Sequence, residues 1–172
     1  MMDPFQTLGI EPAFELDSKD LEQRHRELSR ALHPDRHVGK TPGERRHALG
    51  RAIEVNDAYR IVKDPVRRAE ALLARLGLSV EEGAEPKAAP EFLMEVMEQR
   101  ELLSEARAKR DRAGLERLRA TIEAQQADAL GRLARAFAAT TPDSAALLGA
   151  LGELRYFARF LEEAGAIEDE LL

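Results

Sequence analysis

Apolar residues recur at three- and four-residue steps along most of the chain, and no stretch alternates long enough to make a convincing strand. Glycine and proline separate these helical segments. The pattern predicts a short helix over 3–8 that stops at Gly9. A second helix begins after Asp17, a good N-cap, and ends near Leu32, because Pro34 keeps the residue before it out of the α region. The sequence therefore predicts an all-α fold.

Two more helices are expected in the first half of the chain. The sequence "TPGE" supplies Thr41 as N-cap, Pro42 at the first helical position and Glu44 as a capping-box partner. Asp64 and Pro65 break that helix and start another, which runs through "VRRAEALLARL" to Gly77. Residues 33–41 thus form a loop between two antiparallel helices.

The second half is set apart by the acidic stretch "LSVEEGAEPKAAP", residues 78–90, which holds two prolines and a glycine and is typical of a linker. Three long helical patterns follow at about 90–112, 115–139 and 143–169, with Gly114 dividing the first two. Short connections between them predict an antiparallel three-helix bundle. We therefore expect a first domain over 1–77, a linker over 78–90 and a bundle over 91–172.

Composition narrows the classes of function. The chain has 172 residues, of which 44% are hydrophobic and 34% charged, as in helix-rich globular proteins. A net charge of −6 argues against general nucleic-acid binding, and the absence of cysteine excludes disulfides and thiolate ligands. The N-terminal sequence has no secretory-signal pattern, and no apolar run approaches membrane-spanning length, so a cytoplasmic protein without a membrane partner is expected.

Candidate chemistry is concentrated in "SRALHPDRHVG", residues 29–39. His33, Asp35 and His37 have the spacing H-x-D-x-H, with His47 nearby, and such side chains can bind zinc or ferrous iron. The stretch is surrounded by positive charge on Arg36, Lys40, Arg45, Arg46 and Arg51. This positive charge disfavours binding of a metal cation, so a small helical metalloprotein is kept only as an alternative. No nucleophile motif or phosphate cradle accompanies the His–Asp pair, so no catalytic residue is expected. A purely turn-closing role stays open.

The order of elements around this loop is more specific than the tripeptide. A basic helix ends in His33-Pro34-Asp35, a loop follows, and an antiparallel helix carries "NDAYRIVKDP". Over about residues 3–76 this set resembles the J domain, which recruits DnaK-class chaperones and stimulates their ATP hydrolysis. The resemblance implies that the tripeptide docks at the nucleotide-binding domain and interdomain linker of the chaperone.

The same resemblance implies that basic side chains beside the tripeptide meet an acidic chaperone surface. These side chains are Arg24, Arg26, Arg30 and Arg36. Attraction of this kind raises the association rate more than the affinity. Two positions depart from the usual pattern: His25 stands where an aromatic ring is common, and Glu27 interrupts the basic stripe. We expect His25 to be neutral and partly buried.

The second half is similar to the HscB family of J-type co-chaperones. The similarity rests on "DPVRRAEALLARLG" and, after the linker, "PEFLMEVMEQRELLSEA"; the Gly/Phe-rich stretch and zinc-binding cysteines of a general DnaJ are missing. In that family the bundle binds the iron–sulfur scaffold IscU and delivers it to HscA, a DnaK-class ATPase. The resemblance implies a co-chaperone for iron–sulfur cluster assembly with no enzymatic activity, cofactor or metal of its own. A J protein for a general DnaK and another client is the alternative.

Helical geometry separates the core and surface of the first bundle helix. Phe92, Val96, Leu103 and Ala106 share one face and form the expected core stripe. The apolar side chains of Leu93, Met94 and Met97 fall outside it, and Glu98 and Glu101 would rim them with acid. Exposed apolar clusters of this kind usually mark partner sites.

The last helix shows a similar division. Its expected core stripe is Leu147, Leu151, Leu154, Ala158 and Leu161. Tyr156 would project from about the opposite side with Phe160 near it, and Arg155 is adjacent. The family resemblance implies that Tyr156 contributes to scaffold binding together with Leu93, Met94 and Met97. The alternative is that these residues pack against the J domain or one another.

Overall fold

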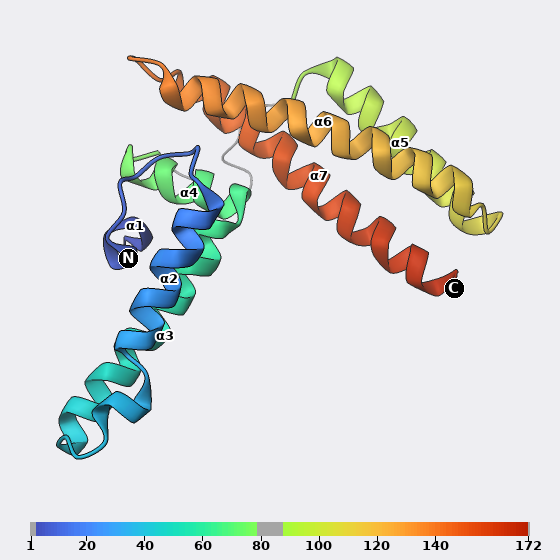
Figure 1. Cartoon of the computed structure of the whole chain (residues 1–172). Coiled ribbons are helices and arrows are strands. Elements are labelled where there is room, and N and C mark those ends of the chain that lie inside the picture. The colour runs from blue at the N-terminus through green and yellow to red at the C-terminus, as the bar shows by residue number, and fades with distance from the viewer. Residues whose placement is uncertain (1–2, 79–87, 172) are drawn as a thin grey trace. The chain divides into compact units, whose positions relative to one another are not determined.

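The computed structural model describes residues 3–78 and 88–171, and every regular element in these ranges is a helix. The all-α prediction is therefore confirmed (Figure 1). The chain divides into two compact units, Met1–Leu78 and Ser79–Leu172. Most of the predicted linker, residues 79–87, lies outside the described residues.

The first unit is an antiparallel helical hairpin with two short helices packed near its base. It contains α1 (Pro4–Leu8), α2 (Ser18–Ala31), the 3-10 turn η1 (Pro34–His37), α3 (Pro42–Lys63) and α4 (Pro65–Arg75). In Figure 1, α2 and α3 lie side by side and η1 sits at the closed tip between them. The expected caps form: the Asp17 carboxylate accepts from two backbone N–H groups, and Thr41 and Glu44 make both bonds of a capping box.

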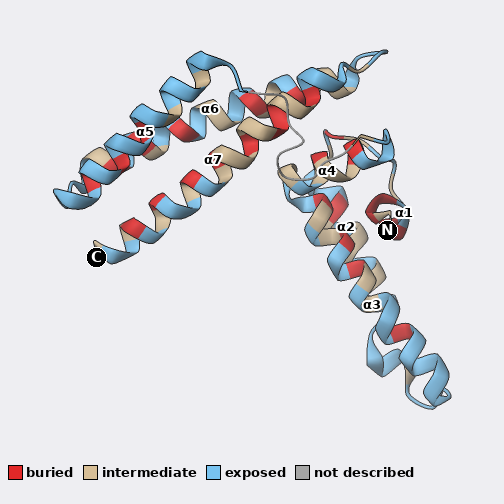
Figure 2. Cartoon of the chain, turned by 180° about the vertical axis from the view of Figure 1, so that it is seen from behind, coloured by how far each residue is buried: buried red, intermediate tan, exposed pale blue. Residues whose placement is uncertain are grey.

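The core of the first unit lies at the base of the hairpin. Its buried apolar side chains include Phe5, Leu8, Leu21, Val55, Ala58, Val62, Ala69, Leu72 and Leu73. None of residues 22–47 is buried, and Figure 2 shows the tip of the hairpin as mostly exposed surface. The loop that follows α2 is therefore held away from the core, where another protein can reach it.

Gly9 ends α1 and leaves room for the side chain of Arg24 from α2. Its φ of 64° lies in the left-handed region, and a Cβ on Gly9 would stand 2.8 Å from the Arg24 guanidinium. Nε of Arg24 donates a hydrogen bond of 2.8 Å to the Leu8 carbonyl, one of the free carbonyls at the end of α1. The left-handed backbone favours glycine at this position, and a larger residue would force the Arg24 guanidinium to shift.

The second unit consists of α5 (Pro90–Ala108), α6 (Arg112–Ala138) and α7 (Ser144–Glu170). The antiparallel helices α6 and α7 make the more extensive packing interface, and α5 lies along α6 (Figure 1). The core includes Leu103, Leu115, Ile122, Leu133, Leu147, Leu151, Leu154, Phe157 and Phe160. Ion pairs join Arg100 to Glu163, Arg107 to Glu170, Arg119 to Glu168 and Arg132 to Glu153 across helices.

Phe92 and Val96 of the expected core stripe of α5 are only half-buried, whereas Leu103 and Ala106 are buried as predicted.

Two further details of the bundle differ from the sequence prediction. Gly114 does not divide two helices, because it lies in the first turn of α6 and its N–H donates to the Asp111 carboxylate at 2.9 Å. Asp111 is an effective N-cap, so the break falls three residues earlier. In α7, Phe160 is fully buried whereas Ala158 and Leu161 are partly exposed. The larger apolar ring takes the core position, since it removes more surface from water.

Candidate functional site

The His33-Pro34-Asp35 tripeptide forms the exposed tip of the hairpin. Pro34 is the first residue of η1, and Nδ1 of His33 accepts a hydrogen bond of 3.3 Å from the Asp35 backbone N–H. The same nitrogen lies 3.5 Å from the Asp35 carboxylate, whose side chain is 87% exposed. The turn is thus closed by the tripeptide itself, while the imidazole and carboxylate remain accessible to a partner.

The histidines near this tip do not assemble a metal site in the described part of the chain. No group of three or more His, Asp or Glu side chains in residues 3–78 or 88–171 is placed to hold an ion. Both ring nitrogens of His37 are covered and have no hydrogen-bond partner, and His47 is exposed. The H-x-D-x-H spacing therefore does not bring its side chains together as ligands.

The four predicted chaperone-binding arginines do not share one environment. Arg26, Arg30 and Arg36 are exposed, and Arg26 lies 3.7 Å from Glu22 on its own helix. Arg24 is half-buried because its guanidinium is bonded to the end of α1, and it also pairs with Glu27 at 3.7 Å. Arg24 therefore has a structural contact that the sequence pattern did not reveal.

His25 is half-buried between α2 and α3, as the sequence predicted. Its Nε2 lies 2.9 Å from Oδ1 of Asn56 on α3 and 3.3 Å from the Ser29 hydroxyl. The contact with Asn56 joins the two helices of the hairpin below the tip. Both contacts give His25 a role in packing within the unit.

The apolar side chains of α5 expected at the surface are found there. Leu93 is 51% exposed, Met94 72% and Met97 73%, and Glu98 and Glu101 are exposed beside them. We call Leu93, Met94 and Met97 the α5 patch. Its members are not sealed inside the bundle, and a water-exposed cluster of this size and flexibility is typical of a protein-binding surface.

Tyr156 is half-buried against α5, and Arg155 beside it is partly exposed. The Tyr156 hydroxyl donates a hydrogen bond of 3.1 Å to Oε1 of Gln99, and the ring meets Phe92 edge-on at 5.7 Å between centroids. The Arg100 guanidinium lies 5.8 Å from the centre of the Tyr156 ring. Since Arg100 follows Met97 by three residues on the same side of α5, Tyr156 borders the α5 patch. Burial raises the pKa of the Tyr156 phenol, against the opposing influence of Arg100.

Sequence reasoning missed Gln99 and Arg100. Gln99 is only 5% exposed, and its Nε2 donates a 2.8 Å hydrogen bond to Oε1 of Gln125 on α6. The available signal was its position, because Gln99 falls between Val96 and Leu103 in the expected apolar stripe. Arg100 pairs with Glu163 and so joins α5 to α7. Arg100 and Glu163 are 63 residues apart in the sequence, so no local pattern predicts that they form an ion pair.

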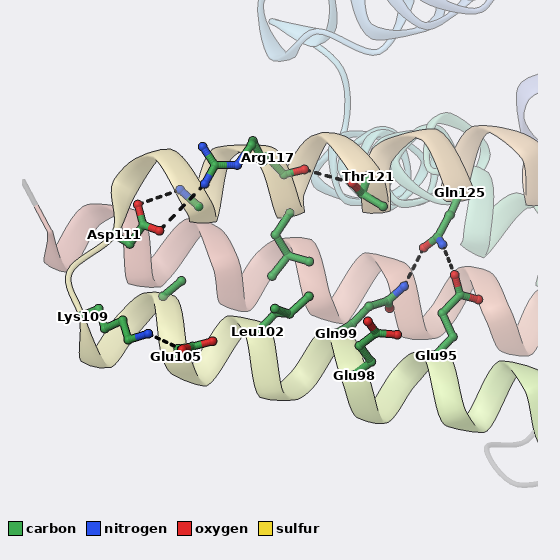
Figure 3. Close-up of a pocket in the computed structure, with 13 residues that line it drawn as sticks. Glu95, Glu98, Gln99, Leu102, Glu105, Lys109, Asp111, Arg117, Thr121 and Gln125 are labelled. Atoms are coloured by element: carbon green, nitrogen blue, oxygen red, sulfur yellow. Dashed lines mark hydrogen bonds and ion pairs between the residues drawn. The ribbon is translucent and has the colours of Figure 1, made fainter.

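A groove between α5 and α6 lies on the other flank of α5 (Figure 3). The groove has a volume of about 460 Å³, and its lining includes the exposed Leu102 together with Glu95 and Glu98. Lys109 is paired with Glu105, and Arg117 lies 4.0 Å from Asp111. Its lining is therefore of mixed charge, and it contains no arrangement suited to one class of ligand.

The hairpin with its exposed tripeptide and the separate helical bundle define a J-domain co-chaperone. Residues 3–71 match the DnaJ domain family, and residues 88–165 match the family described as the HSCB C-terminal oligomerisation domain. The chain belongs to the HscB family of co-chaperones, as the sequence resemblance indicated. Among the helices that the structure describes, none combines the length and the apolar composition of a membrane span.

Relatives and solved structures agree with this assignment. The chain is 39% identical to a co-chaperone protein HscB homolog of Neisseria meningitidis strain MC58 over 142 residues, 83% of this chain and 86% of that one. It is 34% identical to a homolog from Shewanella sp. strain ANA-3, with 99% of each chain covered. The chaperone HscB structure from Vibrio cholerae matches with TM-score 0.82 and 33% identity over 99% of this chain and all of that one. Human co-chaperone HscB matches with TM-score 0.85 and 26% identity, over 96% and 82% of the two chains.

Proposed function

We propose that this chain binds an IscU-like iron–sulfur scaffold through its bundle and delivers it to an HscA/DnaK-class chaperone. Its J domain would stimulate the ATPase of that chaperone and so assist cluster transfer to iron–sulfur proteins. The observation that carries the proposal is that two accessible surfaces, the tripeptide tip and the α5 patch, belong to separate compact units. Two proteins can therefore be recognised by different parts of one chain.

The chaperone contact in this proposal is the tip of the α2–α3 hairpin. His33 and Asp35 offer a hydrogen-bonding ring and a carboxylate, and Pro34 restricts the backbone between them. Arg26, Arg30 and Arg36 are exposed and can attract an acidic surface from a distance. Arg24 contributes mainly by holding α1 against α2.

The scaffold contact is the α5 patch, with the Tyr156 ring at its border. Met94 and Met97 have flexible thioether side chains that can adapt to an apolar partner surface. Glu98, Glu101 and Arg155 would form a polar rim that favours one orientation of the scaffold. The chain itself carries out no covalent step in this proposal, since ATP hydrolysis belongs to the chaperone. The cytoplasm is the expected place of action.

The proposal is tested by the steady-state ATPase rate of the purified chaperone in the presence of this protein. Asp35→Asn should abolish stimulation and leave the circular dichroism spectrum unchanged, because the side chain is exposed and makes no contact with the core. Asp57→Asn, at an exposed aspartate of α3, is the matched control and should stimulate normally. Full stimulation by Asp35→Asn would show that the tip is not the chaperone contact.

A further inference from the structure

A series of three hydrogen bonds crosses the bundle from Tyr156 to Glu95. The Tyr156 hydroxyl donates to Oε1 of Gln99 at 3.1 Å, and Nε2 of Gln99 donates to Oε1 of Gln125 at 2.8 Å. Nε2 of Gln125 then donates to the Glu95 carboxylate; Figure 3 shows the two bonds of Gln125. Every donor points the same way, and the series ends on a carboxylate, which when ionised can only accept. The orientation of each amide is thereby determined by its neighbours.

Gln99 is the buried link in this series. It occupies a position of the α5 core stripe where an aliphatic residue would continue the pattern, between Val96 and Leu103. An amide buried in such a place is unfavourable unless both of its ends are hydrogen-bonded. In this bundle both ends are bonded, one to α6 and one to the phenol of α7.

We propose that Gln99 is a positioning residue that holds the Tyr156 hydroxyl inward, so that the ring meets the scaffold as a purely apolar surface beside the α5 patch. The proposal rests on the function proposed above. Arg100 also restrains the Tyr156 ring. Its guanidinium lies 5.8 Å from the ring centre and is ion-paired with Glu163. Phe92 meets the ring edge-on. The ring is therefore restrained by three neighbours on α5. Arg100 also hydrogen-bonds the hydroxyl oxygen, and Gln99 accepts its proton.

Loss of Gln99 would affect the ring more than the fold. A half-buried hydroxyl without an acceptor is unfavourable, and the ring relieves this by turning its hydroxyl toward water. That movement would place a polar group where the scaffold is expected to meet an apolar one. The raised pKa of the Tyr156 phenol agrees with a hydroxyl held away from solvent.

The test compares Gln99→Leu, Tyr156→Phe and the double variant with the unchanged protein. Affinity for a purified IscU-like scaffold is measured by isothermal titration calorimetry, at a temperature where circular dichroism shows each variant folded. Gln99→Leu should bind about tenfold more weakly, which corresponds to about 1.4 kcal/mol. Tyr156→Phe keeps the ring and removes the hydroxyl, so Gln99→Leu in the Tyr156→Phe background should cost no further affinity. Gln126→Leu changes a glutamine of α6 outside the series and serves as the control.

A spectroscopic measurement separates ring position from general stability. The chain has two tyrosines and no tryptophan, so Tyr59→Phe leaves the Tyr156 phenol as the only one to titrate near 295 nm. In that background Gln99→Leu should bring the phenol pKa down toward its ordinary value of 10.0, because the hydroxyl turns into water.

Three results would overturn the positioning role. These are unchanged scaffold affinity in Gln99→Leu, an unchanged phenol titration, or a large loss of affinity in Tyr156→Phe, which would mean that the hydroxyl itself contacts the scaffold. If Gln99→Leu does not fold, Gln99→Met removes the same amide with a side chain of similar length and replaces it in both measurements, with the same results overturning the role. If the unchanged protein does not bind the scaffold, the function proposed above fails instead.

Discussion

His25 on α2 stacks on Tyr59 of α3, with ring centroids 4.0 Å apart and ring planes within 11° of parallel. The stack lies between the buried base of the hairpin and its exposed tip, where few other side chains are covered. Histidine thus takes the place that an aromatic ring often holds in a J domain. It retains the flat contact and adds a hydrogen bond to Asn56.

His25→Ala should lower the free energy of unfolding of the first unit by about 1 kcal/mol, through loss of the ring contact. His25→Phe should cost less, because it keeps the stacked face and gives up only a hydrogen bond at a half-exposed site. Thermal unfolding followed by circular dichroism measures both. His47→Ala removes an exposed histidine and provides the baseline. Equal stability of His25→Ala and His47→Ala would mean that the stack contributes nothing.

Arg24→Ala should destabilise the first unit by about 1–2 kcal/mol, since the charged donor of the Leu8 carbonyl is lost. Arg26→Ala, two residues away, should leave stability nearly unchanged, because the pair that Arg26 makes with Glu22 is exposed. Urea unfolding of the two variants tests this. Any loss of chaperone stimulation in Arg24→Ala would then have to be separated from its effect on α1. If both variants unfold at the same urea concentration, the bond to Leu8 is not a stabilising contact.

Replacing Leu93 and Met97 together by alanine should weaken scaffold binding by a few kcal/mol and change stability little, because both side chains are exposed. Leu103→Ala on the same helix should lower stability and leave scaffold affinity nearly unchanged. Leu103 is buried, so its truncation should cost about 2–5 kcal/mol of stability. Calorimetric titration with the scaffold and urea unfolding give the two readouts. Unaltered scaffold affinity in the patch variant would place the contact elsewhere.

Thr41 lowers the pKa of the Glu44 carboxyl below its ordinary value of 4.5, first through its hydroxyl and then through its backbone N–H. A carboxyl with a lowered pKa in the folded state stabilises that state above its ordinary pKa, and the contribution is lost as the pH falls through the lowered value. Thr41→Ala should therefore raise the pKa of Glu44 toward 4.5. Titration of the carboxyl carbon by NMR measures it, with Thr121→Ala as the control. An unchanged Glu44 titration would show that the capping box does not form in solution.

Much of the local structure could be read from single residues and their near neighbours. Asp17, Thr41 and Asp64 start helices because their side chains accept from backbone N–H groups a few residues ahead, and Pro42 and Pro65 fit the first helical turn. The exposed position of the α5 patch also followed from helical geometry alone. These features depend on contacts within one helix or one turn.

Most features that the sequence pattern did not reveal depend on contacts between helices. Phe157 and Phe160 of α7 are buried because packing against α6 removes their large rings from water. Gly114 is a different case, since Asp111 caps the same helix and its contact is local. Arg24 looked like surface charge, although the end of α1 binds it.

By itself, the sequence determined the order of the helices, their caps, the tripeptide between α2 and α3, and the membership of the HscB family. Only the tertiary structure decided that Gln99 is buried and that the Tyr156 hydroxyl points inward to it. The physical reason is distance along the chain: helix periodicity and capping act over a few residues, whereas Gln99 and Tyr156 are 57 residues apart and meet only when α5 packs against α7.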